Sequence, residues 1–166
     1  MERIRFTPHF IGGKSRMKRA PLFCKGVIIV CEDFRLHQRP DGSNVVAELV
    51  KKLGYDCDII TRGGGILDLV SPEDVGAGFD RSMMRDIKVA EILHQAEEIT
   101  IIGHEDCRAY GYRHMPTMQA ELNLIHADMR RGASVLKRIF PKANVSLQVA
   151  RLLAGSVDKF ELTKLA

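Results

Sequence analysis

The stretch GVIIV at residues 26–30 is a continuous apolar run that leads directly into Cys31. A run of this length is typical of a strand buried on both faces of a parallel sheet. The run ITIIG at residues 99–103 has the same character and leads into His104. Open α/β sheets bind ligands in the crevice at the carboxyl ends of their strands. We therefore expect the side chains that follow these two runs to lie close together.

The elements around these two runs predict an α/β fold with a mainly parallel central sheet of four to five strands flanked by helices. A segment that begins with Ser71-Pro72 is expected to be a loop or short turn. The expected strands are 26–31, 56–61, 99–103, 145–153 and 157–162. Three helices are expected. The first is capped by Ser43 or Asn44 and ends near Leu53, and the second covers 81–96. The third runs from 118 to 130, or on to 139, and ends before Pro141.

The chain of 166 residues, 45% of them hydrophobic, suits one domain with one core. Residues 1–24 lack a clear period and contain Gly12-Gly13 and Pro21, so they are expected to form an irregular N-terminal arm. Residues 25–166 are expected to form a single α/β zinc-binding domain, for the reasons that follow.

Composition disfavours several classes of partner. No apolar run approaches the roughly 20 residues that span a bilayer, and no secretory signal is expected. The net charge of +4 is modest, and the chain lacks an aromatic-interleaved basic stripe, so neither membrane nor nucleic acid is expected as a partner. The four cysteines show no disulfide-scaffold spacing, which favours a cytoplasmic location with reduced thiols.

Two cysteines and a histidine follow the two apolar runs. His104 and Cys107 are three residues apart and can share one ion, while Cys31 comes from the other strand. Zinc prefers sulfur and nitrogen ligands in tetrahedral geometry, and an open fourth position distinguishes a catalytic zinc from a structural one. A single cysteine is usually a small buried hydrophobe, and Cys24 and Cys57 keep that interpretation. Together, the other three residues favour a zinc site.

Asp33 and Arg35 extend this hypothesis, because in an extended segment they point to the same side as Cys31. An arginine that pairs with the carboxylate at two points keeps it ionised, and the carboxylate can then orient a zinc-bound water. Two thiolates cancel the charge of the zinc, so this water needs such an acceptor. Two alternatives stay open: Asp33 takes the fourth zinc position, or the two residues form an ordinary surface ion pair.

These motifs resemble those of the β-class carbonic anhydrases. That family carries Cys-x-Asp-x-Arg and His-x-x-Cys, which match CEDFR at 31–35 and HEDC at 104–107, and the resemblance covers about residues 25–165. The chain is similar to a divergent, small member. The resemblance implies zinc held by Cys31, His104 and Cys107, an Asp33–Arg35 dyad that orients zinc-bound hydroxide, hydration of carbon dioxide to bicarbonate, and a homodimer or higher homo-oligomer.

Two departures from the family pattern bear on the substrate. Arg62, Gly63 and Gly64 lie in a turn where the family has Arg-Asn-Ala-Gly, and their backbone amides and charge can form a small-anion pocket or simply a flexible strand exit. Arg108 replaces the usual glycine after the last zinc cysteine, where it would narrow the pocket or attract an anion. Related members act on small carbon–sulfur substrates, so hydrolysis of such a substrate is an alternative.

Two further functions compete with carbon dioxide hydration. Cys107 and Arg113 fit the Cys-x5-Arg spacing of a thiolate loop that cradles phosphate, which would make Cys107 a nucleophile with a low pKa. In the other alternative, the same three zinc ligands hold a structural zinc closed by Asp33, and the protein is a non-catalytic zinc-binding module.

Overall fold

A computed structural model describes residues 22–111 and 115–165 of the chain. The chain forms a five-stranded sheet in the order β2-β1-β3-β4-β5. The first four strands pair in parallel, and β5 runs antiparallel to β4. The predicted mainly parallel α/β sheet is confirmed. The strands are β1 (Gly26–Cys31), β2 (Cys57–Arg62), β3 (Glu98–His104), β4 (Asn144–Leu152) and β5 (Phe160–Lys164).

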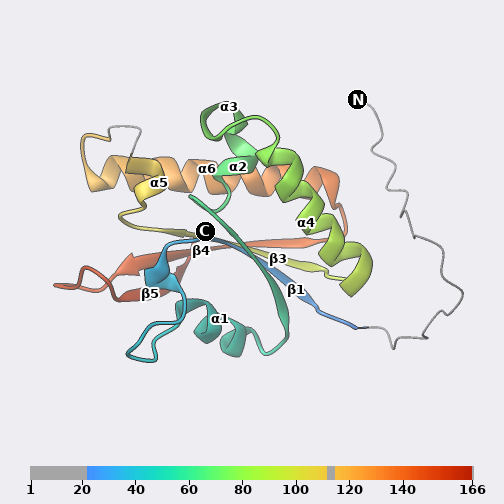
Figure 1. Ribbon diagram of the computed structural model, residues 1–166, viewed down its shortest axis with the longest axis horizontal. Helices are drawn as coiled ribbons and strands as arrows, with labels where there is room; N and C mark the ends of the chain where they lie inside the picture. The colour runs from blue at the N-terminus through green and yellow to red at the C-terminus, as the bar shows by residue number, and fades with distance from the viewer. Residues whose placement is uncertain (1–21, 112–114, 166) are drawn as a thin grey trace, which may run out of the picture.

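Helices cover both faces of the sheet (Figure 1). On one face, α6 packs against β3 and β4 while α4 packs near β2; on the other face, α1 lies close to β5. No helix in the described ranges is both long enough and apolar enough to span a bilayer. The helices are α1 (Val45–Leu53), α2 (Leu67–Val70), α3 (Pro72–Val75), α4 (Phe79–His94), α5 (Arg108–Gly111) and α6 (Met118–Ile139), with a 3-10 turn, η1, at Phe34–Leu36.

Local capping explains where the long helices begin and end. The Asn44 side chain accepts a hydrogen bond of 2.8 Å from the backbone N–H of Ala47, and α1 ends at Gly54, whose φ of 74° suits glycine. The Thr117 side chain caps α6 in the same way. This helix continues to Ile139, the later of its two predicted C-terminal ends, and stops before Pro141.

The structure differs from the sequence prediction in several short elements: neither α5 nor η1 was expected, and η1 replaces the extended segment predicted to carry Asp33 and Arg35. At the segment expected to be a loop or short turn, Ser71 alone separates α2 from α3, and Pro72 begins α3. The last strand begins at Phe160 rather than at 157, because the Ser156 hydroxyl accepts backbone hydrogen bonds from Asp158 and Lys159 and holds a turn there. Most of the predicted arm, residues 1–21, lies outside the described residues, so the arm and the single-domain boundary stay predictions.

The contact between α6 and α2 is tight enough to require a glycine. A Cβ built on Gly132 of α6 would lie 2.3 Å from Ile66 Cγ1, and Ile66 is almost fully buried at the start of α2. Neither the helix backbone nor the enclosed isoleucine has room to give way. The α2 segment follows directly from the turn after β2, so this contact also positions that turn.

We expect Gly132→Ala to destabilise the protein by about 1–3 kcal/mol, because overpacking outweighs the gain in helix propensity. Gly111→Ala is the control, since a Cβ at Gly111 meets no atom of the described residues within 4 Å. The measurement is chemical denaturation at one fixed protein concentration. Equal or greater stability of Gly132→Ala would contradict the tight contact.

Candidate metal centre

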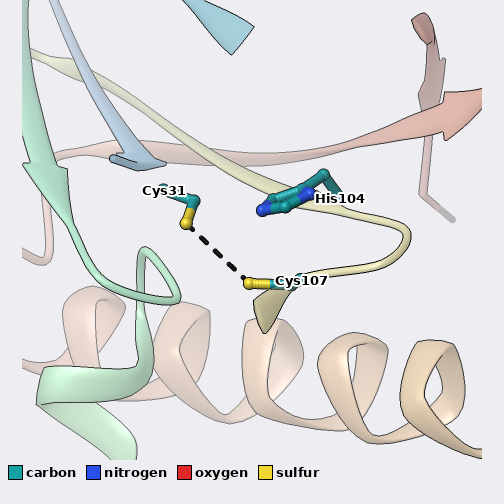
Figure 2. A group of neighbouring side chains, drawn as sticks. All are labelled: Cys31, His104 and Cys107. Carbon is teal, nitrogen blue, oxygen red and sulfur yellow. Dashed lines mark hydrogen bonds between the residues drawn. The ribbon is translucent and has the colours of Figure 1, made fainter. Parts of the chain in front are cut away.

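Three side chains predicted as ligands converge at the carboxyl ends of β1 and β3. The two strands are parallel neighbours with Val30 opposite Ile102, so their ends lie side by side. Cys31 ends β1, His104 ends β3, and Cys107 follows in the turn before α5. One ligand atom from each of these three buried residues lies within 4.8 Å of the others, and Figure 2 shows the side chains pointing toward one another.

His104 presents a nitrogen without a partner to this cluster. Its Nδ1 lies 2.9 Å from the carbonyl oxygen of Glu105, which only accepts, so Nδ1 carries the proton and donates it. The other nitrogen, Nε2, is buried and has no hydrogen-bond partner within the described part of the chain. A buried imidazole nitrogen is normally hydrogen-bonded, and a histidine that ligates a metal typically donates its other N–H to a carbonyl or carboxylate. This arrangement therefore suits a metal ligand.

The two cysteines face each other with their sulfurs 3.8 Å apart. The hydrogen bond with Cys107 lowers the pKa of Cys31, against the opposing effect of burial. The same bond and burial raise the pKa of Cys107. The backbone N–H of Gly64 also donates to the Cys31 sulfur at 3.3 Å, which stabilises a thiolate. These shifts favour a thiolate at Cys31 and a protonated thiol at Cys107, whose proton a soft divalent cation would displace.

Asp33 and Arg35 form a two-point ion pair beside the cluster. Arg35 donates from Nε to Asp33 Oδ1 at 3.0 Å and from Nη2 to Oδ2 at 2.7 Å, and both side chains are largely buried. Burial opposes ionisation of Asp33, but the hydrogen bonds from Arg35 outweigh it and lower the pKa of the carboxyl group. In this conformation the Asp33 carboxylate faces Arg35 and is not part of the three-residue ligand group.

Arg35 has further partners that the sequence analysis did not single out. Its guanidinium also donates to the Asp106 carboxylate, the Asp106 carbonyl and the Val157 carbonyl, and it lies over the Phe160 ring at 5.4 Å. Phe160 also makes an edge contact with the His104 ring, with centroids 5.9 Å apart. The position of Asp106 inside HEDC was a signal for its role, but no local pattern marks the other two.

The turn after β2 borders the cluster, but its arginine is occupied by acidic partners. Arg62 pairs with Asp86 and lies 3.5 Å from the buried carboxylate of Asp68. Gly64 has a φ of 74° and contacts Cys31 as described above. Gly63 instead lines a neighbouring cavity. A role for these residues in binding an anion stays a prediction.

Arg108 lies outside the cluster of buried ligands. Its side chain is 87% exposed, and its Nε lies 3.9 Å from Oδ1 of Asp106, which makes a weak ion pair. It therefore does not narrow the space at the three ligands in this conformation. Its predicted attraction of an anion stays a prediction.

The raised pKa of Cys107 speaks against a phosphate-cradling thiolate loop. A nucleophilic cysteine needs a low pKa, whereas burial and the bond with Cys31 raise that of Cys107. Arg113, which that alternative requires as an anion clamp, lies outside the described residues.

Comparison with known sequences finds distant relatives. No protein-family model matches the chain. An uncharacterized protein of Rickettsia conorii, RC0076, is 26% identical over 125 residues, which cover 72% of this chain and 63% of that protein. An uncharacterized protein of Rickettsia bellii is also 26% identical, over 72% of this chain and 71% of its own length. The match thus spans less than two thirds of the first relative.

Solved structures reveal the fold. A tetrameric β-carbonic anhydrase from Sordaria macrospora superposes with a TM-score of 0.55 at 14% identity, over 87% of this chain and 82% of that one. The β-carbonic anhydrase CafA of Aspergillus fumigatus gives 0.53 at 15% identity, over 87% and 76%. The β-carbonic anhydrase CcaA gives 0.53 at 12%, over 86% and 85%. The chain has the fold of the β-carbonic anhydrases, and the resemblance seen in its motifs is confirmed at that level.

We expect the purified protein to bind one zinc ion per chain through the three clustered side chains. Cys31→Ser and His104→Ala should lower zinc affinity at least ~10²-fold, because each removes one of only three protein donors. Zinc content after dialysis, read by elemental analysis, measures this. Cys57→Ser, a half-buried thiol outside the cluster, should keep its zinc. Undiminished zinc in both ligand variants would refute the site.

Proposed function

We propose that this chain is a zinc lyase that catalyses the reversible hydration of carbon dioxide to bicarbonate. The observation that carries the proposal is the two-point Asp33–Arg35 pair beside a group of three buried metal-binding side chains. The β-carbonic anhydrase fold supports the same reaction, although at 12–15% identity the fold by itself does not determine an activity.

Zinc fits the donors present at the proposed site. Two sulfurs and one imidazole nitrogen are its preferred ligands, and the unpartnered Nε2 of His104 is oriented by the Glu105 carbonyl. Bound there, zinc would act as a Lewis acid that makes a water molecule nucleophilic at the fourth position.

Asp33 is the proposed acceptor that orients the attacking water. An ionised carboxylate only accepts hydrogen bonds, and both Asp33 oxygens are engaged by Arg35 from one side. The remaining lone pairs therefore point in fixed directions. Because the hydrogen bonds from Arg35 lower its pKa, Asp33 stays ionised across neutral pH and does not donate a proton in place of accepting one. Arg35 acts through Asp33 and is a positioning residue.

A cavity of about 530 Å³ offers a route for a small substrate. Its lining includes Glu32, which directly follows Cys31, and Ala109, which lies two residues after Cys107. Leu67 and Gly63 contribute apolar lining that suits carbon dioxide. Acidic side chains in the same wall repel an anion, which favours release of the bicarbonate product.

A homo-oligomer in the cytoplasm is part of the proposal. The Sordaria macrospora structure is described as tetrameric. In the present chain, β2 is an edge strand, and exposed apolar side chains lie on it and on α4, including Ile59, Ile92 and Leu93. All four cysteines are free thiols, as expected in a reducing compartment.

Asp33→Asn should retain zinc and lose about 10²-fold or more in kcat for carbon dioxide hydration, because an amide is a weaker acceptor and also presents donors. Stopped-flow hydration measured across pH tests this, and the wild-type rate should rise above neutral pH. Asp41→Asn removes an exposed carboxylate that lies eight residues after Asp33 and accepts hydrogen bonds from Ser43, and it serves as the control. A fully zinc-loaded wild type without activity at any pH would instead make the protein a non-catalytic zinc-binding module.

Sedimentation velocity tests the oligomer. We expect a species larger than the 18.6 kDa chain at micromolar concentration. Ile92→Lys combined with Leu93→Lys should shift it toward the monomer, because charges on these exposed apolar positions oppose burial against another copy. A wild-type protein that sediments only as a monomer would contradict this part of the proposal.

A further inference from the structure

We propose that Asp106 is a positioning residue that fixes the Arg35 guanidinium, and that it thereby keeps the Asp33 carboxylate away from the metal. This inference rests on the proposed function only in that the cluster binds a metal ion. Asp106 is not one of the three ligands and does not belong to the Asp33–Arg35 pair, but it lies in the short turn between His104 and Cys107.

The Arg35 guanidinium donates hydrogen bonds to Asp33 on one side and to Asp106 on the other. Its Nε and one Nη2 bond go to Asp33, its other Nη2 bond goes to the Asp106 carbonyl at 2.7 Å, and Nη1 donates to Asp106 Oδ2 at 2.9 Å and to the Val157 carbonyl at 3.0 Å. All five N–H groups of the guanidinium are thus used. Rotating the guanidinium away from Asp33 would break the bonds to Asp106 as well.

The backbone of Asp106 supports a specific placement of this side chain. Its φ of 53° lies in the left-handed region, which costs energy for residues other than glycine and persists only where the surroundings fix it. Arg35 donates two hydrogen bonds to this residue, one to the carbonyl and one to the carboxylate. The arginine of the dyad is therefore tied directly to the turn that carries two of the three ligands.

The charges around Arg35 are arranged as one cation between two carboxylates. Asp33 is the more buried of the two, with a side chain 11% exposed against 36% for Asp106. The other cation near Asp106 is Arg108, whose Nε lies 3.9 Å away on an exposed side chain and competes weakly. Asp106 thus neutralises the end of Arg35 that Asp33 does not reach.

Loss of the Asp106 carboxylate would free one of the two Nη1 N–H groups of the guanidinium and weaken the constraint that holds the guanidinium against Asp33. Asp33 follows Cys31 by only two residues, and a carboxylate is an acceptable fourth ligand for a zinc-like ion. The released carboxylate would then compete with external ligands for the open coordination position. The Val157 carbonyl and the Phe160 ring remain as contacts, so the protein should still fold and load metal.

Azide binding to the cobalt(II)-substituted protein tests this, because the visible spectrum of cobalt reports what occupies the open position without requiring turnover. Asp106→Gly suits the left-handed backbone while removing the carboxylate, and we expect it to weaken azide binding about tenfold. Asp106→Asn retains an acceptor for Nη1 and should bind azide nearly as the wild type does. Asp106→Ser is the second variant if Asp106→Gly does not fold.

The decisive variant is the double substitution Asp33→Ala with Asp106→Gly. It should bind azide as tightly as Asp33→Ala alone, because the competing carboxylate is gone. The control is Asp158→Ala, which removes an ion pair of 2.9 Å with Arg39. The exposed fraction of the Asp158 side chain, 38%, is close to that of Asp106. This variant should leave azide binding unchanged.

Wild-type azide affinity in Asp106→Gly would overturn the inference. So would a loss that persists in the double variant, since Asp106 would then act on the ligand turn itself. Carbon dioxide hydration by the wild type is measured separately, so an inactive protein with the expected azide pattern refutes the proposed function and leaves the inference standing.

Discussion

The parallel pairing of β1 with β3 is the constraint on which the site depends. With Val30 opposite Ile102, both strands end at the same edge of the sheet and deliver Cys31 and His104 to one point. All six residues of β1 are buried, so both faces of the strand are packed and the register is strongly specified. A slip of one residue would turn Cys31 to the opposite face and separate the sulfur from the imidazole.

Strands and capped helices were predictable because their signals are local. Continuous apolar runs identified β1 and β3 to within a residue, and Asn44 with Gly54 bounded α1. The helices at Ser71-Pro72 were missed because they are only one turn long, too short for an apolar period to show. The start of β5 was misplaced because two backbone hydrogen bonds to the Ser156 hydroxyl extend the turn, whereas valine at 157 is typical of a strand.

At the site, the residues in local motifs were likewise predictable, whereas the residues that act through long-range contacts were not. The three clustered residues and the Asp33–Arg35 pair lie in two short motifs, and parallel topology is enough to bring such motifs together. The acidic partners of Arg62 come from α2 and α4, so its engagement was not visible in the turn itself. The contact of Phe160 with both His104 and Arg35 depends on the antiparallel return of β5, which no motif encodes.

The Val157 carbonyl that accepts from Arg35 lies 122 residues further along the chain. During synthesis from the N-terminus, this separation corresponds to a delay on the order of ten seconds between the emergence of the arginine and that of its last acceptor. In that interval the guanidinium cannot complete its hydrogen bonds, and Phe160 is absent from the side of His104. The centre is therefore among the last parts of this domain to mature, and a nascent chain released early would carry the three ligands without the contacts of Val157 and Phe160.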